Sequence, residues 1–253
     1  MFFRFTGVVV LAAAFSFGGA SAASAAPNAV PASTVSPNWA GYAVQADSGQ
    51  AFYFVTASWV EPAMAKPCGS PGTNPSLVTF STGFDGFADG TQEHAGTALQ
   101  CAFKPGTPPV FKETAWYETC VGTHCTTVRL FGDFPVQAGD HIIVAVAYAN
   151  DSFTFVLHNT RTGQTFEATV ANTFGATRSS VEAVADVPVP GGGAPLLDFG
   201  SITFANFGFH GTGNEEGHSD LVGITMSGPV SAVRAEPGDR HGNHFTVTWK
   251  ARV

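Results

Sequence analysis

Residues 141–157 read His141-Ile-Ile-Val-Ala-Val-Ala-Tyr148-Ala-Asn-Asp-Ser-Phe153-Thr-Phe-Val-Leu157, and this stretch decides the fold class. Larger apolar side chains fall on every second residue of both halves, which is the period of a strand with one buried face. They are Ile142, Val144, Val146 and Tyr148 in the first half and Phe153, Phe155 and Leu157 in the second. The polar step 149–152 is typical of a turn, so the segment predicts a β-hairpin.

The same alternation of strand and turn continues on both sides of this hairpin. Further strands are expected at 51–59, 165–170, 179–187, 201–209, 221–226 and 244–250. No window of 11 or more residues in the mature chain has a helical period without Gly or Pro. We therefore predict an all-β fold, an antiparallel two-sheet β-sandwich of the jelly-roll or lectin-like kind, as a single domain over residues 37–253.

The composition excludes several functional classes. Charged residues make up 12% of the 253, hydrophobic residues 44%, and the formal net charge is −8. So much apolar surface excludes a generally disordered chain. The four lysines, Lys66, Lys104, Lys112 and Lys250, form no basic run, so a nucleic-acid partner is not expected.

The first 25 residues have the pattern of a secretory signal peptide. Arg4 precedes an apolar stretch, and small residues follow with candidate cleavage sites after Ala22 and after Ala25. The apolar run is shorter than the ~20 residues that a membrane span needs. We expect a secreted, monomeric protein without a membrane segment after cleavage, with residues 26–36 as a flexible lead.

The four cysteines are an even number in a chain expected to be secreted, which predicts two disulfides with three possible connectivities. Cys120 and Cys125 are close enough in sequence to close a tight hairpin, which would leave Cys68 and Cys101 as the second pair. The alternative is a metal site of Cys120, His124 and Cys125, which an oxidising compartment disfavours. No metal or other cofactor is expected.

Seven segments carry motifs that occur in a fixed order. They are Ser36–Tyr42 (SPNWAGY), Phe54–Pro62 (FVTASWVEP), Gly83–Gly86 (GFDG), Ala115–Glu118 (AWYE), Ser179–Asp186 (SSVEAVAD), Leu197–Gly200 (LDFG) and Phe245–Trp249 (FTVTW). Together they resemble the glutamic peptidase (eqolisin) family over nearly all of the mature chain.

This resemblance implies a secreted, acid-acting endopeptidase with a polypeptide substrate and no metal. In the family a Glu accepts a proton from the attacking water, and a Gln amide holds that water and donates a hydrogen bond to the developing oxyanion. These two roles suit peptide hydrolysis, because one group must accept a proton and the other must donate a hydrogen bond without carrying charge. The flanking residues place the catalytic Glu at Glu182.

The family's Gln position differs in this sequence. Aligned on Gly96, the family's Gln-Thr-Gly falls on His94-Ala95-Gly96. Three hypotheses follow: His94 is the donor, and if protonated it would also lower the pKa of Glu182; Gln92, on the same face of a regular strand, supplies the amide; or catalysis has been lost.

Further residues are expected in the cleft. The resemblance makes Trp39, Asp85, Trp116 and Glu118 candidate substrate-binding residues, and Asp186 a second acid that could tune Glu182. Fewer aromatic residues line the presumed cleft than in the family, since Ser81 and Ala183 replace aromatic positions. This thinning motivates a rival hypothesis, a non-catalytic β-sandwich module that binds a glycan or a peptide.

Overall fold

A computed structural model describes residues 32–64, 76–87, 89–102, 107, 110–130, 132–188, 195–212, 220–228 and 231–252. These residues form β-strands and no helix, so none of them builds a helix that could cross a membrane. The strands are β1 Ala32–Ser36, β2 Trp39–Gln45, β3 Phe52–Val60, β4 Ser76–Asp85, β5 Thr91–Ala102, β6 Val110–Val121, β7 His124–Leu130, β8 His141–Ala149, β9 Ser152–Asn159, β10 Gln164–Ala171, β11 Ser180–Asp186, β12 Ser201–Gly211, β13 Leu221–Ser227, β14 Val233–Pro237 and β15 Phe245–Trp249.

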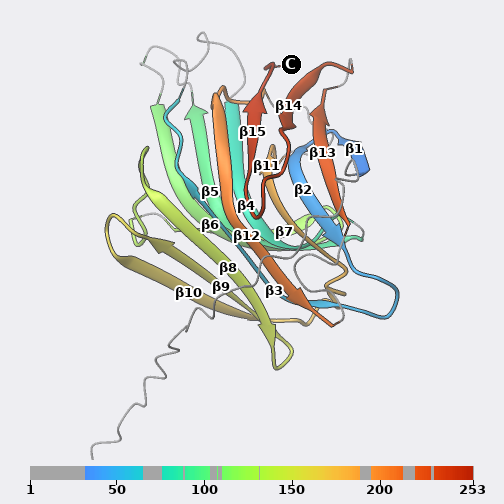
Figure 1. Cartoon of the computed structure of the whole chain (residues 1–253). Helices are drawn as coiled ribbons and strands as arrows, with labels where there is room; N and C mark the ends of the chain where they lie inside the picture. Colours follow the sequence, from blue (N-terminus) through green and yellow to red (C-terminus); the bar gives the residue numbers. More distant parts are fainter. Residues whose placement is uncertain are drawn as a thin grey trace, which may run out of the picture. The chain divides into compact units, whose positions relative to one another are not determined.

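The strands form one hydrogen-bonded path that bends into two layers (Figure 1). The order is β10-β9-β8-β3-β12-β15-β14-β13-β2-β11-β4-β5-β6-β7, with β1 added to β13. β12 belongs to both layers, pairing with β15 in one and with β3 in the other, and its pairing with β3 shifts register between Ala205 and Gly208. A bulge of this kind bends a strand, which allows β12 to pass from one sheet to the next.

The core lies between these layers and is rich in aromatic side chains. Phe84 of β4 packs on Phe153 of β9 with ring centroids 5.6 Å apart, and Tyr117 of β6 stacks on Phe155 at 5.1 Å. Phe84, Phe153 and Phe155 are completely buried. The antiparallel β-sandwich predicted from the alternation is therefore confirmed.

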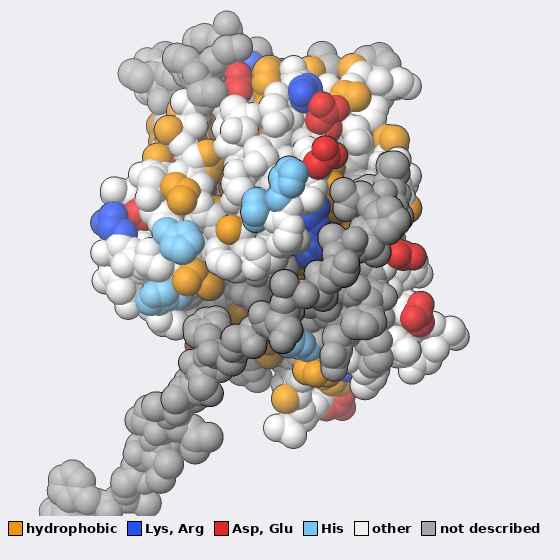
Figure 2. Space-filling model, in the orientation of Figure 1, with side chains coloured by type: hydrophobic (Ala, Val, Ile, Leu, Met, Phe, Trp, Pro, Cys, Tyr) orange, Lys and Arg blue, Asp and Glu red, His pale blue; other side chains and the backbone are white. Residues whose placement is uncertain are grey.

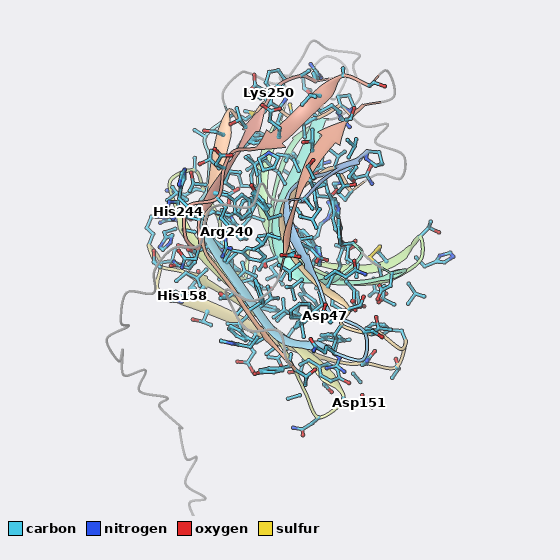
Figure 3. The ribbon with its side chains drawn as sticks, turned by 45° about the vertical axis from the view of Figure 1, so that its right-hand side comes forward. Asp47, Asp151, His158, Arg240, His244 and Lys250 are labelled. Carbon is cyan, nitrogen blue, oxygen red and sulfur yellow. A yellow bond between two sulfur atoms is a disulfide. The ribbon has the colours of Figure 1, made fainter. Side chains whose placement is uncertain are left out.

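The predicted hairpin is strands β8 and β9. Asn150 and Asp151 both have positive φ angles, 49° and 58°, as a two-residue type I′ turn requires. Tyr148 donates a hydrogen bond to Asp151, which lies at the tip of the hairpin (Figure 3). Asn and Asp adopt this conformation more readily than other non-Gly residues, so the turn follows from the local sequence.

Strands β2, β4, β5, β6 and β7 lie outside the ranges expected from the alternation, and two short strands also differ from expectation. Ala32–Ser36, expected within a flexible lead, forms β1, which pairs in parallel with β13 although most of its side chains are exposed. The pairing uses main-chain hydrogen bonds, which leave no hydrophobic pattern in the sequence. Val233–Pro237 forms β14, a strand that the pattern did not predict. Residues 26–31 and the signal peptide lie outside the described residues.

The predicted Cys120–Cys125 disulfide is present and joins directly paired residues of β6 and β7. Cys101 is also disulfide-bonded, while its predicted partner Cys68 lies outside the described residues. The described part of the face in Figure 2 shows few charged side chains among apolar and uncharged ones, and some of them touch near the top of the view. That surface agrees with the low charged fraction of 12%.

Candidate functional site

Glu182 and His94 lie on one line across three neighbouring strands. Glu182 of β11 pairs with Gly83 of β4, and Gly83 pairs with His94 of β5. A Cβ atom on Gly83 would lie 2.3 Å from His94 Cδ2, so only glycine leaves room for the imidazole. The two side chains therefore meet over β4, with His94 Nε2 3.2 Å from Glu182 Oε1.

The strand that carries Glu182 is held firmly at its start. Asp85, completely buried at the end of β4, accepts hydrogen bonds from the backbone N–H groups of Arg178 (2.8 Å) and Ser179 (2.6 Å). All seven residues of β11 are buried, and both of its edges are paired. Asp85, expected in the cleft, does not line the cavity beside the pair, and its contacts give it a role in positioning β11.

Burial governs the protonation of the pair, since Glu182 is 0% and His94 1% exposed. Burial raises the pKa of Glu182 well above its ordinary value, and the charge of Asp85 raises it further. Burial lowers the pKa of His94 to about 3. Both shifts favour a neutral His94 beside a protonated Glu182, which differs from the expectation that a protonated His94 lowers the Glu182 pKa.

Two neighbours fix the imidazole. The ring of Trp39 stacks on His94 with centroids 5.5 Å apart, and Ser81 Oγ lies 3.4 Å from Nδ1. With Nε2 accepting from the Glu182 carboxyl, Nδ1 carries the hydrogen and points it at Ser81. Trp39 therefore covers the imidazole, and Ser81 orients it.

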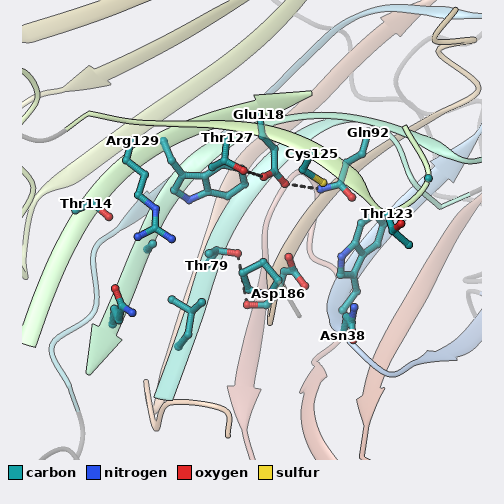
Figure 4. A pocket seen from close by; sticks show the side chains of 17 residues that line it. Asn38, Thr79, Gln92, Thr114, Glu118, Thr123, Cys125, Thr127, Arg129 and Asp186 are labelled. Carbon is teal, nitrogen blue, oxygen red and sulfur yellow. Dashed lines mark hydrogen bonds between the residues drawn. The ribbon is translucent and has the colours of Figure 1, made fainter. Parts of the chain in front are cut away.

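A cavity of about 530 Å³ lies beside the pair (Figure 4). Its lining includes Trp39, Trp116, Glu118 and Asp186, four of the residues expected in the cleft, and Gln92. Neither Glu182 nor His94 lines it, because Trp39 lies over the imidazole. The sequence thus points to five of the 17 residues that line the cavity, but not to the cover over His94.

Gln92 faces the cavity but is engaged elsewhere. Its Nε2 donates a 3.1 Å hydrogen bond to Glu118 Oε1, and Thr127 donates a 2.7 Å bond to Glu118 Oε2. The structure thus brings His94, and not Gln92, to Glu182. Gln92 and Thr127 instead fix Glu118 in the cavity wall (Figure 4).

The sequence matches the model of the peptidase A4 family over residues 37–238. The chain belongs to this family. No curated protein matches the sequence. Its fold is similar to that of scytalido-glutamic peptidase, crystallised with a transition-state analog inhibitor, with a TM-score of 0.61, 18% identity, and 86% of this chain and 100% of that chain covered. It is also similar to SCP-B, an eqolisin-family peptidase in complex with the tripeptide Ala-Ile-His, with a TM-score of 0.60, 19% identity and the same coverage.

Two carboxyls of the cavity wall in this A4-family chain are nearly buried. Asp186 is 5% and Glu118 7% exposed, and Asp186 Oδ1 has no hydrogen-bond partner among the described residues. Burial raises the pKa of both groups, and the charge of Glu118 adds to the effect on Asp186. In acid these carboxyls are uncharged and able to donate as well as accept hydrogen bonds.

Glu93 is a buried acid that was not predicted from the sequence. It lies next to His94 on the opposite, core-facing side of β5, and burial together with the charge of Asp85 raises its pKa to about 9. Strand parity offered a signal, because Glu93 lies on the same inward face of β5 as the apolar residues Ala95 and Leu99. A carboxyl at an inward position is expected to be protonated or paired.

One cluster in the described part of the chain has metal-ligand spacing, namely Glu118, Cys120 and Cys125. Both sulfurs are joined in the disulfide, so no thiolate is available as a ligand. The alternative metal site at Cys120, His124 and Cys125 is excluded by the same bond.

Proposed function

We propose that this chain is a secreted, acid-acting glutamic-type endopeptidase in which Glu182 and His94 form the catalytic pair. The observation that carries the proposal is the 3.2 Å contact between His94 Nε2 and Glu182 Oε1, made beside a cavity in a chain of the peptidase A4 family. The signal-peptide pattern of residues 1–25 and the disulfide-bonded cysteines support secretion.

The pair works through one shared proton. At rest the proton lies on Glu182 in this proposal, which is the state that both pKa shifts favour. Moving it to His94 Nε2 creates a carboxylate and an imidazolium, the base and the donor that peptide hydrolysis needs. Water and the polar peptide group entering the site would favour this ionic form, because they solvate both charges.

Glu182 Oε2 is the oxygen available to the nucleophile, since it has no hydrogen-bond partner among the described residues. A water held there attacks the scissile carbonyl and gives a proton to Glu182, while His94 Nε2–H, which contacts Glu182 Oε1 at rest, donates to the oxyanion. The C–N bond then breaks, and Glu182 passes its proton to the leaving amine. Atoms and charge balance, and both side chains return to the ionic form.

Access requires a movement of Trp39. This side chain is 9% exposed and lies between the imidazole and the cavity. In our proposal the indole turns aside and admits the scissile bond. The polypeptide that then fills the cavity excludes bulk water. Gln92 stays bound to Glu118 and does not serve as the donor.

The test is digestion of a denatured protein at acidic pH. The wild type is expected to cleave it with or without a metal chelator, and Glu182→Gln to lose about 10²- to 10⁴-fold in rate, which is the usual contribution of a general base. A wild-type rate in Glu182→Gln would remove Glu182 from the mechanism. Folding of the variant is checked by its thermal transition.

A second candidate is a binding module without turnover. The observation that favours it is the closure of the pair, whose members are 0% and 1% exposed under Trp39. Saturable binding of a peptide or glycan in the cavity, with no cleavage between pH 2 and 7, would support this function over the peptidase.

A further inference from the structure

Arg129 of β7 is the one cationic side chain among the residues that line the cavity. It is exposed, and no ion pair or hydrogen bond within the described part of the chain holds its guanidinium; the ion pairs there involve Arg161, Lys250 and His94. An unpaired guanidinium at the wall of a cavity is available to a ligand.

The sheet aims Arg129 inward. Arg129 pairs with Trp116, and Trp116 pairs with Gly96 of β5, so these residues lie on one line across the sheet. Figure 4 shows Arg129 reaching into the pocket next to Thr114, with Asp186 farther across. The guanidinium therefore lies where a chain bound in the cavity would present a side chain.

In acid, Arg129 carries the main charge of the cavity lining. Glu118 and Asp186, the two acids of the lining, have raised pKa values, so they hold their protons to higher pH than an exposed carboxyl does. His94 lies beneath Trp39 and is neutral above a pH of about 3. Lys112 lies on the same face of β6 as Thr114 but outside the lining. The planar guanidinium can bind a carboxylate through two parallel hydrogen bonds.

We propose that Arg129 makes the cavity selective for polypeptides that carry an acidic side chain, Asp or Glu, close to the scissile bond. The inference rests on the proposed function only in taking the cavity as the substrate site. β5 and β7 are separated by two strand spacings, about 10 Å, which an extended chain covers in about three residues. The acidic residue is therefore expected within about three positions of the cleaved bond.

The test measures binding and does not depend on turnover. In a Glu182→Gln background, fluorescent peptides that differ only by Glu or Gln at one position are titrated at pH 5, where a peptide Glu is ionised. The Glu peptide is expected to bind about fivefold more tightly at one position, the effect of a single partly exposed ion pair. Adding Arg129→Gln should abolish this preference, and Arg129→Glu should shift it to Lys peptides.

The matched control is Lys112→Gln, which removes a cation from the same face outside the cavity and should keep the preference. Equal affinities for the Glu and Gln peptides at every position, or a preference that survives Arg129→Gln, would overturn the inference. If the acidic preference is found but the wild type cleaves nothing, the peptidase proposal fails and the binding inference stands. If the wild type cleaves the substrate but shows no acidic preference, the peptidase proposal stands and the binding inference fails.

Discussion

Glu182 and His94 contact each other across an entire intervening strand, and Gly83 is the residue that permits it. Their atoms Oε1 and Nε2 lie 3.2 Å apart, while their strands β11 and β5 both pair with β4 and not with each other. The chemistry we propose therefore depends on the absence of a side chain at Gly83 as much as on the two groups that react.

Gly83→Ala is expected to damage the site and the fold together. The added Cβ would lie 2.3 Å from His94 Cδ2 and 2.2 Å from the Glu93 carbonyl oxygen. Overpacking of this kind costs about 1–3 kcal/mol, and displacing His94 should abolish cleavage. Urea unfolding and peptidase assays check both effects. Gly90→Ala is the control, since nothing lies within 4 Å of a Cβ there, and a similar loss in both variants would contradict the account.

Trp39→Ala should raise the pKa of His94. Burial lowers that pKa to about 3, and the stacked indole is part of the cover. Removing it admits water, which favours the charged imidazolium, so the pKa should move up toward its ordinary value. The pH titration of the His94 C–H resonance in NMR spectra measures this shift directly. Trp116→Ala, which removes another cavity indole, should leave the titration in place; an unchanged pKa in Trp39→Ala would contradict the covering role.

Stability is expected to fall as the pH rises toward alkaline values. Burial raises the pKa of Glu61 to about 8 and that of Glu93 to about 9, so the folded chain holds these protons more tightly than the unfolded chain. Their stabilising effect is complete below the unfolded value of about 4.3 and is lost as the pH rises through 8 to 9. Urea unfolding between pH 5 and 9 should show this decline.

Glu61→Gln and Glu93→Gln should each flatten that decline, because an amide cannot ionise. Glu167→Gln, at an exposed position of β10, serves as the control and should follow the wild type. A free energy of unfolding that increases across this pH range in the wild type would show that these two carboxyls do not control alkaline stability.

The sequence predicts much of this fold, for reasons visible in particular segments. The alternation in 141–157 predicts β8 and β9, and their Asn-Asp turn forms as expected. The alternation did not predict β2, β4, β5, β6 and β7, and it also missed β1 and β14, whose side chains are mostly exposed or partly buried without a clear period. Propensity is a weak guide where main-chain pairing alone holds a strand.

The sequence brings forward candidate residues for the site, but it does not predict the contacts among them. The motif order pointed to Glu182 and His94, and the structure brings them together. Strand parity placed Gln92 and His94 on one face but did not predict which of them reaches Glu182. The outcome depends on the space that Gly83 leaves for the imidazole and on the hydrogen bond from Gln92 to Glu118. Asp85 was expected in the cleft, yet its carboxylate anchors the start of β11.

The disulfide of the β6–β7 hairpin should support the cavity wall. Gly122, Thr123 and Cys125 of this hairpin line the cavity. Closing a six-residue loop stabilises the fold by about 2 kcal/mol in the chain-entropy description. Replacing Cys120 and Cys125 together by Ser should lower the thermal midpoint and raise KM more than it lowers kcat. An unchanged KM would show that the hairpin does not contribute to substrate binding.

The central claim, that Glu182 and His94 act as one catalytic pair, is tested most directly by a double-mutant cycle on kcat/KM with a peptide substrate at acidic pH. We predict that Glu182→Gln and His94→Ala each lose at least about 10²-fold, and that the double variant is scarcely worse than either, because groups that act as a unit are strongly non-additive. Losses that multiply in the double variant, or a wild-type kcat/KM in either single variant, would contradict the claim.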